Sequence, residues 1–295
     1  MGTSPAQFEG IEQPGLSVRA LLPDDGWDER WDGIVVDDEM KARLLSFGLF
    51  CLTRRSSVSW VRFPVHGLAL LAGPPGTGKT TLAHGLANRI ARTLVDHGLA
   101  ENALFGVVDP HAFPSEFLGE SQRTVARLFA ETLPDLAARG LPLIVLLDEV
   151  EALAVNRSRA SFETNPVDVH RATNAVLTGV DHVAAEHDNV LLIATTNEER
   201  EIDQAFLSRV DLREQFELPQ PAAIEAMLVD TLAEIGVRVD GQAGRLAAVA
   251  ERCASHSLDA RQVRKLVLRA IVSNGPELAL APDRIDVDHL WEVVE

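Results

Sequence analysis

The sequence predicts an α/β protein with a doubly wound parallel sheet, followed by a small helical domain. Short apolar runs alternate with amphipathic stretches through the first two thirds of the chain, which is typical of a parallel sheet covered by helices. After Pro219 and Pro221 the alternation stops and only amphipathic stretches follow. We therefore expect a short N-terminal segment, residues 1–30, a large α/β domain, residues 31–219, and a helical lid domain, residues 220–295.

The individual elements follow from hydrophobic periodicity. Apolar runs predict buried strands at residues 67–73, 104–110, 141–147 and 189–197. Apolar residues at helical spacing predict helices at residues 37–55, 81–98, 120–140, 167–186, 222–236, 242–255 and 259–273. The acidic stretch 24–39 contains Trp27 and Trp31. It favours a solvated segment whose tryptophans pack on the core, with a partner-binding surface as the alternative.

Composition limits the classes of function. The formal net charge of −17 argues against a nucleic-acid partner, because binding nucleic acid requires basic surface to neutralise phosphates. Apolar runs such as 143–147 are too short to cross a bilayer, and the N-terminus does not resemble a signal peptide. Cys51 and Cys253 are far apart and match no metal spacing, so we expect ordinary thiols in a reducing cytoplasm.

The stretch GPPGTGKT, residues 73–80, is the most specific motif in the chain. It fits G-x-x-x-x-G-K-[ST] in full, between a predicted strand and a predicted helix. The glycines let the backbone turn its N–H groups toward phosphate oxygens, and the helix N-terminus adds partial positive charge. Lys79 can contact the β- and γ-phosphates of ATP, and Thr80 can bind Mg²⁺ through its hydroxyl. The expected nucleotide contacts are Pro75, Gly76, Thr77, Gly78, Lys79, Thr80 and Thr81.

A pair of acids, Asp148 and Glu149, ends the apolar run LIVLL. Ligands of open α/β sheets bind at the carboxyl ends of strands. We expect Asp148 to hold Mg²⁺ through its water shell and Glu149 to polarise the attacking water as a general base. An acid-rich helix start is the alternative, but the glycine-rich loop upstream favours a catalytic pair.

Asn197 ends the next apolar run, LLIATTN. Because the sheet brings this strand end beside Asp148, the amide can orient the attacking water near the γ-phosphate. The alternative is that Asn197 caps the following helix.

Two arginines are candidates for stabilising charge in the transition state of phosphoryl transfer. Arg209 follows Asn197 in the stretch AFLSRVDL, and Arg261 opens a helix in the C-terminal part. Arg213 and Arg264 lie close enough in sequence to be alternatives to them. A surface salt bridge is the simpler interpretation of any single arginine.

The stretch HAFPSEFLGES, residues 111–121, places Phe117 and Leu118 side by side in a loop bracketed by Pro114 and Gly119. Loops lie on protein surfaces, so adjacent bulky apolar residues there need a reason. They either tuck under the domain or form an apolar surface that contacts another molecule.

Taken together, the motifs resemble the AAA+ ATPases over roughly residues 30–275. The glycine-rich loop, the DE pair, the TTN strand and the helical lid occur in the order of that family. Within it, DEVEAL, RATNAVLTGVD, TTNEEREIDQAFLSRVDL and LDARQVRKL resemble the pachytene checkpoint ATPases, which remodel HORMA-domain proteins. The stretch LSRVDL keeps one arginine where common AAA unfoldases carry two. The short N-terminal segment resembles bacterial relatives rather than eukaryotic members, which have an adaptor-binding domain there.

This resemblance implies roles for further residues. Arg209 would be the finger that acts on a neighbouring subunit, and Arg261 the sensor in the lid. Ile34 and Val35 would lie near the adenine. Phe117 and Leu118 would line the central pore, where six apolar copies grip many sequences because aromatic contacts do not require specific hydrogen bonds.

The resemblance also implies partners. We expect a homohexamer that hydrolyses ATP with Mg²⁺ in the cytoplasm and threads a HORMA-domain protein through its pore. The short bacterial relatives disassemble complexes of HORMA proteins with cGAS-like nucleotidyltransferases and so restrain anti-phage signalling. The alternatives are a general AAA+ unfoldase or disaggregase, an unfoldase that feeds a protease, a DNA-associated ATPase, and a nucleotide-dependent assembly module with little turnover.

Overall fold

The chain divides into two compact units. The computed structural model describes residues 15–16, 18–108, 124–155, 166–239 and 242–294. The first unit runs up to Gly73 and continues from Lys79 to Gln215, and the second joins Pro74–Gly78 to the residues from Phe216 onward. The domain limits at residues 30 and 219 that the sequence suggests stay a prediction.

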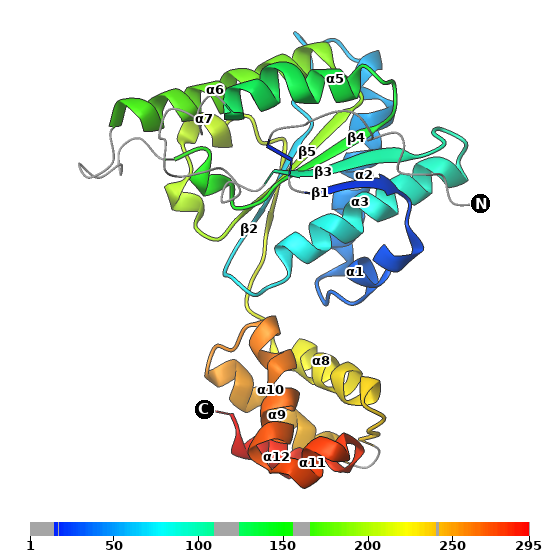
Figure 1. The fold of residues 1–295 in the computed structure, drawn as a ribbon, viewed down its shortest axis with the longest axis vertical. Helices are drawn as coiled ribbons and strands as arrows, with labels where there is room; N and C mark the ends of the chain where they lie inside the picture. Colours follow the sequence, from blue (N-terminus) through cyan, green and yellow to red (C-terminus); the bar gives the residue numbers. More distant parts are fainter. Residues whose placement is uncertain (1–14, 17, 109–123, 156–165, 240–241, 295) are drawn as a thin grey trace. The chain divides into compact units, whose positions relative to one another are not determined.

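A six-stranded sheet forms the centre of the first unit (Figure 1). Its strands are β1 Val18–Leu22, β2 Leu68–Ala72, β3 Ala103–Val108, β4 Leu143–Leu147, β5 Val190–Thr196 and β6 Leu212–Gln215. They lie in the order β1-β3-β4-β5-β2-β6. The pairs β3–β4, β4–β5, β5–β2 and β2–β6 are parallel, whereas β1 is antiparallel to β3. The predicted α/β class and the parallel arrangement of the central strands are confirmed.

The four strands predicted from apolar runs are the four that are buried along their whole length, β2 to β5. Such continuous apolar runs are expected when both faces of a strand are covered. The sequence reading missed β6, whose residues LREQ are mostly polar and only partly buried. It also missed β1, because one edge strand inside a segment of mixed composition has no clear period. The antiparallel strand β1 thus adds one edge strand to the predicted parallel sheet.

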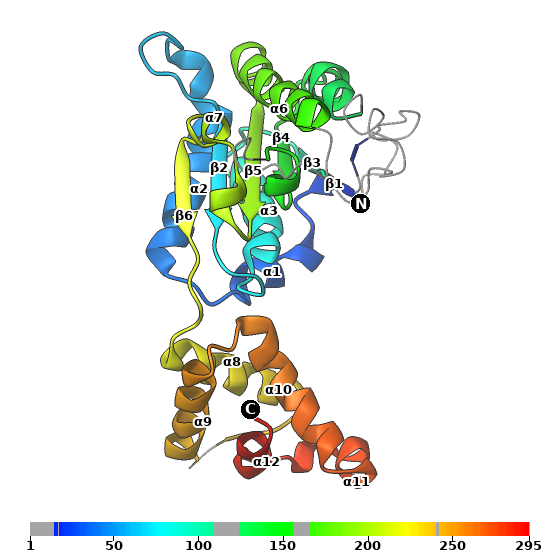
Figure 2. The same ribbon diagram turned by 90° about the vertical axis from the view of Figure 1, so that its left-hand side faces the viewer.

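Helices cover both faces of the sheet (Figures 1 and 2), which confirms the doubly wound arrangement. On one face lie α2, Asp38–Thr53, and α3, Lys79–Asp96. They approach closely at Gly48 of α2, where an added Cβ would lie 2.3 Å from Ile90 of α3 and 3.2 Å from Leu191 of β5. On the other face lie α6, Pro166–Glu186, and a helical segment that ends at Ala137.

The helix predicted at residues 120–140 changes character along its length. Residues 124–127 are α-helical, η5, Leu128–Thr132, is a π-helix, and α5, Leu133–Ala137, is α-helical again. Pro134 stands in the first turn of α5 and has no N–H to donate to the preceding turn. The wider π turn thus occurs where the regular hydrogen-bond ladder is interrupted.

The tryptophan-containing segment packs on α3, as the favoured interpretation expected. It forms η2, Asp25–Trp27, and α1, Glu29–Asp32. The Trp27 ring lies 5.3 Å from the rings of both His84 and Phe105. The side chain of Asn88 in α3 donates to the carbonyl of Asp24 at 3.0 Å and to a carboxylate oxygen of Asp28 at 2.8 Å. Tilted and edge-on ring contacts, together with hydrogen bonds, hold this segment against α3.

Short helical turns complete the first unit. They are η3 Arg55–Ser57, η6 Val150–Ala152, η7 Glu199–Glu201 and α7 Gln204–Leu207.

The second unit is helical. It contains α8 Pro221–Glu234, α9 Ala243–Ser255, α10 Ala260–Ser273, α11 Pro276–Leu280, η8 Pro282–Arg284 and α12 Val287–Glu292. Asp259 begins α10 with a capping box to Gln262, which satisfies two N–H groups at the helix start. The three longest helices match the predicted ones, whereas α11 and α12 were not anticipated. Within the described part of the chain, every helix is either too short or too polar to span a bilayer.

Both cysteines are buried free thiols. Burial raises the pKa of Cys51 to about 12, since a thiolate is poorly solvated there. Burial likewise raises the pKa of Cys253. Thiols in such surroundings are poor nucleophiles, in agreement with the structural role expected for them.

Gly179 in α6 should not tolerate a side chain. A Cβ at this position would lie 2.3 Å from Cβ of Phe129, and the fully buried ring cannot move away. We expect Gly179→Ala to lower the free energy of unfolding by about 1–3 kcal/mol through overpacking, measured by urea denaturation. The control is Gly244→Ala in α9, where an added Cβ meets nothing within 4 Å. It should raise stability by up to about 1 kcal/mol through helix propensity. Equal effects of the two substitutions would contradict the packing argument.

Candidate functional site

Three strand ends converge at one edge of the sheet. The strand β5 lies between β4 and β2, with Thr196 in register with Ala72 and Ala194 in register with Leu147. Because all three strands are parallel, their carboxyl ends emerge on the same side (Figure 1). The residues that follow these strands are the glycine-rich loop, the Asp148–Glu149 pair and Asn197. The topology therefore brings together five of the predicted site residues, Lys79, Thr80, Asp148, Glu149 and Asn197.

The glycine-rich loop has backbone angles that favour glycine. The φ values of Gly73, Gly76 and Gly78 are 148°, 76° and 94°, a region that residues with a Cβ seldom adopt. Lys79 begins α3 and is only 5% exposed. Its ammonium donates to the carbonyl of Gly73 at 2.7 Å, so the lysine closes the loop across its base. A cationic group at a helix start beside glycine-rich backbone fits a phosphate ligand.

Asn197 links the lysine to the acidic pair. Its Oδ1 accepts from Nζ of Lys79 at 3.0 Å, and its Nδ2 donates to Oε1 of Glu149 at 3.2 Å. The amide oxygen faces the ammonium, which can only donate, and the amide NH₂ faces the carboxylate, which can only accept. One amide thus connects side chains from three segments that are far apart in sequence.

Asp148 gathers two hydroxyl groups. Its Oδ1 accepts from Oγ1 of Thr80 at 2.8 Å and from Oγ1 of Thr195 at 2.5 Å. Thr80 and Asp148 are thus neighbouring hard oxygen donors next to the glycine-rich loop. Mg²⁺ prefers such a set, with one or two protein oxygens and the remaining positions filled by water and phosphate. The residues present fit that ion.

Glu149 has an unusual backbone conformation. Its φ of 51° and ψ of 53° are left-handed, which costs about 1–3 kcal/mol for a residue other than glycine. The N–H of Glu149 donates to Oγ1 of Thr195 at 3.0 Å. This bond ties the turn to β5 and offsets part of the strain. In this conformation the Glu149 carboxylate accepts a hydrogen bond from the side chain of Asn197.

His84 lies one turn beyond Thr80 in α3. Its Nδ1 is 2.7 Å from the carbonyl oxygen of Thr80. Burial lowers the pKa of His84 because the imidazolium loses hydration, although the hydrogen bond to the carbonyl of Thr80 acts in the opposite direction. The imidazole of His84 therefore stays neutral to a lower pH than that of an exposed histidine.

The two arginines near β6 have different partners. Arg209 forms a bidentate pair with Asp181, with Nε–Oδ1 and Nη2–Oδ2 distances of 2.6 and 2.7 Å, and it also donates to the carbonyl of Ala205. The pair with Asp181 raises the pKa of Arg209. Arg213 in β6 pairs with Glu199 and is half exposed. Arg209 is thus held in a defined geometry by a planar fork, and Arg213 by a single ion pair.

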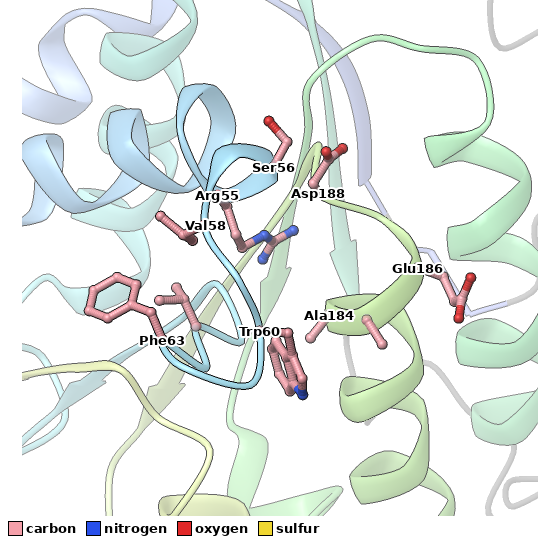
Figure 3. Close-up of a pocket in the computed structure, with 10 residues that line it drawn as sticks. Arg55, Ser56, Val58, Trp60, Phe63, Ala184, Glu186 and Asp188 are labelled. Carbon is pink, nitrogen blue, oxygen red and sulfur yellow. The ribbon is translucent and has the colours of Figure 1, made fainter.

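A cavity of about 260 Å³ lies away from this site (Figure 3). It is lined by Arg55, Ser56, Val58, Trp60, Phe63, Val65, Ala184, Ala185, Glu186 and Asp188. These residues precede β2 and β5, whereas the glycine-rich loop follows the carboxyl end of β2. Arg55 is buried and donates to the carbonyls of His66, His187 and Val190. We interpret this arginine as a structural tie between loops rather than as part of the candidate site.

Comparison with known proteins agrees with this geometry. Residues 69–218 match the model of the "ATPase family associated with various cellular activities (AAA)". That range contains the glycine-rich loop, the acidic pair and Asn197.

The chain belongs to the AAA family. Among curated proteins, this AAA chain is 42% identical over 286 residues to "CD-NTase-associated protein 6" of Pseudomonas aeruginosa, a match that covers 95% of the chain and 91% of the relative. It is 33% identical over 221 residues to the "Pachytene checkpoint protein 2 homolog" of Xenopus tropicalis, which covers 73% of the chain and 49% of that protein. The chain thus spans about half the length of the checkpoint relative. The predicted resemblance to the checkpoint branch is confirmed.

Solved structures agree on the fold of the AAA protein. The "Structure of C. elegans PCH-2" matches with a TM-score of 0.73 and 25% identity, covering 93% of this chain and 72% of that one. A chain of the "E. coli MS115-1 HORMA:CdnC:Trip13 complex" matches with a TM-score of 0.78 and 20% identity. That match covers 95% of this chain and 94% of the other. Membership in an ATPase family makes nucleotide binding a property of the AAA protein.

The remaining predicted site residues are assigned from the resemblance to the checkpoint branch. Phe117 and Leu118 fall outside the described residues. Ile34 and Val35 lie between α1 and α2 and are partly exposed. Arg261 is the second residue of α10 in the second unit. Their assignment to pore, adenine and lid sensor stays a prediction.

Thr195 and Glu151 were missed by the sequence reading. Thr195 is almost fully buried and contacts both members of the acidic pair. Glu151 accepts the N–H of Asn197 at 3.0 Å and so holds the residue that follows β5. The position of Thr195 near the end of an apolar strand is only a weak signal, because buried threonines are common in sheets. Nothing in the pattern DEVEAL distinguishes Glu151 from a surface acid.

His84 should make the AAA protein sensitive to acid. The pKa of His84 is lower in the folded protein than in the unfolded chain. The contribution of neutral His84 to the free energy of unfolding is therefore fully present above about pH 6.5, and it is lost as the pH falls through the folded-state pKa. We expect wild type to lose more stability between pH 7 and pH 5 than His84→Gln, measured by urea denaturation at each pH. The exposed His97 provides the control, because His97→Gln should follow the wild-type profile. Parallel profiles for all three proteins would contradict the role of His84.

Proposed function

We propose that this AAA protein hydrolyses ATP to remodel a HORMA-domain protein and to release it from a cGAS-like nucleotidyltransferase, which restrains anti-phage signalling. The observation that carries the proposal is the 42% identity, over nearly the whole of both chains, to a protein named for its association with a CD-NTase. The fold match to a chain of a complex of HORMA, CdnC and Trip13 components is in keeping with it.

The chemistry follows from the strand-edge site. Lys79 and the loop of residues 75–81 bind the phosphates, and Thr80 and Asp148 are the oxygen donors that hold Mg²⁺. When bound, Mg²⁺ neutralises negative charge on the phosphates during transfer. The Glu149 carboxylate accepts a proton from the attacking water, and Asn197 orients that carboxylate through the 3.2 Å hydrogen bond.

Catalysis is proposed to be completed between subunits of a homohexamer. Arg209, held by Asp181, reaches the γ-phosphate of a neighbouring subunit and stabilises the charge that develops there. Arg261 senses nucleotide from the lid, and Ile34 and Val35 contact the adenine. Phe117 and Leu118 grip the substrate in the central pore. The cytoplasm, where HORMA and nucleotidyltransferase partners would meet, is the proposed location.

Glu149→Gln tests the enzymatic part of the proposal. The amide keeps the shape of the side chain but cannot accept a proton from water. We expect nucleotide binding to persist while kcat for ATP falls about 10²–10⁴-fold, measured by steady-state phosphate release. The control is Glu198→Gln, because Glu198 is exposed beside Asn197 and should leave kcat unchanged. Wild-type turnover in Glu149→Gln would exclude Glu149 as the base, and no turnover in wild type would favour an assembly module.

Phe117→Ala separates hydrolysis from remodelling. The variant should keep ATP hydrolysis within about 3-fold of wild type, since it is remote in sequence from the phosphate-binding residues. It should fail to release a HORMA protein from its nucleotidyltransferase, measured by gel filtration after incubation with ATP. Phe113→Ala in the same stretch is the matched control and should release it. Release of unrelated tagged proteins, but not of HORMA proteins encoded beside the gene, would favour a general unfoldase instead.

A further inference from the structure

We propose that Thr195 is a positioning residue for ATP hydrolysis, whose hydroxyl fixes the metal-binding carboxylate of Asp148 and the backbone of Glu149 relative to one another. The inference rests on the proposed function, because it concerns how the same site is held. It adds a residue from β5 to those that the motifs identify.

The hydrogen-bonding capacity of one hydroxyl accounts for both contacts. Thr195 is 2% exposed, so water does not compete for its Oγ1. The single hydrogen of the hydroxyl is donated to Oδ1 of Asp148 at 2.5 Å, and a lone pair accepts the N–H of Glu149 at 3.0 Å. A threonine hydroxyl has one donor and two acceptor positions, so the two bonds form together. Thr195 therefore connects the side-chain carboxylate of Asp148 to the backbone N–H of Glu149.

The contact with Glu149 controls where its carboxylate points. Glu149 has the left-handed angles φ 51° and ψ 53°, and Thr195 holds the N–H of that same residue. If this bond is removed, the backbone is free to relax toward the right-handed region, which turns the direction of the Cα–Cβ bond. The carboxylate then leaves the amide of Asn197, which it meets at 3.2 Å. Displacement of a reacting group by about 1 Å can slow a reaction about 10²-fold.

Thr195 contacts Asp148 independently of Thr80, the other residue expected to bind the metal. Oδ1 of Asp148 accepts from both Thr80 and Thr195. Thr80 is a candidate metal ligand itself, so Thr195 is the partner that can keep the carboxylate oriented when Thr80 engages the ion. Loss of such an outer partner typically lowers metal affinity or activity about 10- to 100-fold.

The neighbouring threonine provides a matched control. Thr196 is on the same strand, is fully buried, and has the same side chain. Its Oγ1 accepts the N–H of Glu198 at 3.1 Å and, among the described residues, forms no hydrogen bond with either acid. Thr196→Val thus removes a buried hydroxyl from β5 while the contacts to Asp148 and Glu149 stay in place.

The experiment compares Thr195→Val, Thr195→Ser and Thr196→Val with wild type. We expect Thr195→Val to lower kcat for ATP about 10- to 100-fold while KM changes less than about 2-fold. Thr195→Ser retains the hydroxyl and should stay within about 3-fold of wild type, as should Thr196→Val. A second readout without turnover is the Mg²⁺ concentration for half-maximal binding of a fluorescent ATP analogue. It should rise about 10-fold in Thr195→Val alone.

Specific results would overturn the role of Thr195. A kcat and a Mg²⁺ midpoint of Thr195→Val within about 3-fold of wild type would do so, and so would equal losses in Thr195→Val and Thr196→Val. If Thr195→Val does not fold by circular dichroism, Thr195→Cys replaces it, because a thiol of similar size is a weak donor. If wild type shows no turnover, the proposed ATPase function fails, and the Mg²⁺ titration still decides whether Thr195 orients Asp148.

Discussion

The site of this AAA protein depends on the parallel pairing of β5 between β4 and β2. Parallel strands present their carboxyl ends at the same edge, so the loops after residues 72, 147 and 196 meet there. Had any of the three been antiparallel, its loop would have emerged at the far edge. The continuous apolar sequences of these strands make this pairing stable, since each is buried on both faces. Burial by helices on both sides is thus a condition for the chemistry at the edge.

At that edge, a small hydrogen-bond network fixes the positions of the site side chains. Asn197 bridges Lys79 and Glu149, while Thr195 bridges Asp148 and the backbone of Glu149. The strained conformation of Glu149 is maintained because Thr195 of β5 binds its N–H and Asn197, which follows β5 directly, binds its carboxylate. Strain of this kind is common at functional sites, where the surrounding structure over-determines an unfavourable conformation.

The motifs alone identified most members of the candidate site. GPPGTGKT indicates Lys79 and Thr80 because few sequences satisfy its spacing between a strand and a helix, and Asp148, Glu149 and Asn197 follow as the polar residues that end buried strands. The sequence motifs do not indicate Thr195 and Glu151 as members of the site. A buried threonine or a nearby acid is common in any sheet protein, and only their distances to the acidic pair and to Asn197 distinguish them.

What the sequence by itself determined is the set of local patterns: the apolar runs of β2 to β5, the amphipathic helices and the glycine-rich loop. These depend on the side-chain period and on backbone freedom, which are properties of neighbouring residues. Tertiary structure alone decided the antiparallel edge strand β1, the short polar strand β6, and the pairing of Arg209 with Asp181. These features join residues far apart in the chain. The free energy that selects them comes from contacts that no local pattern encodes.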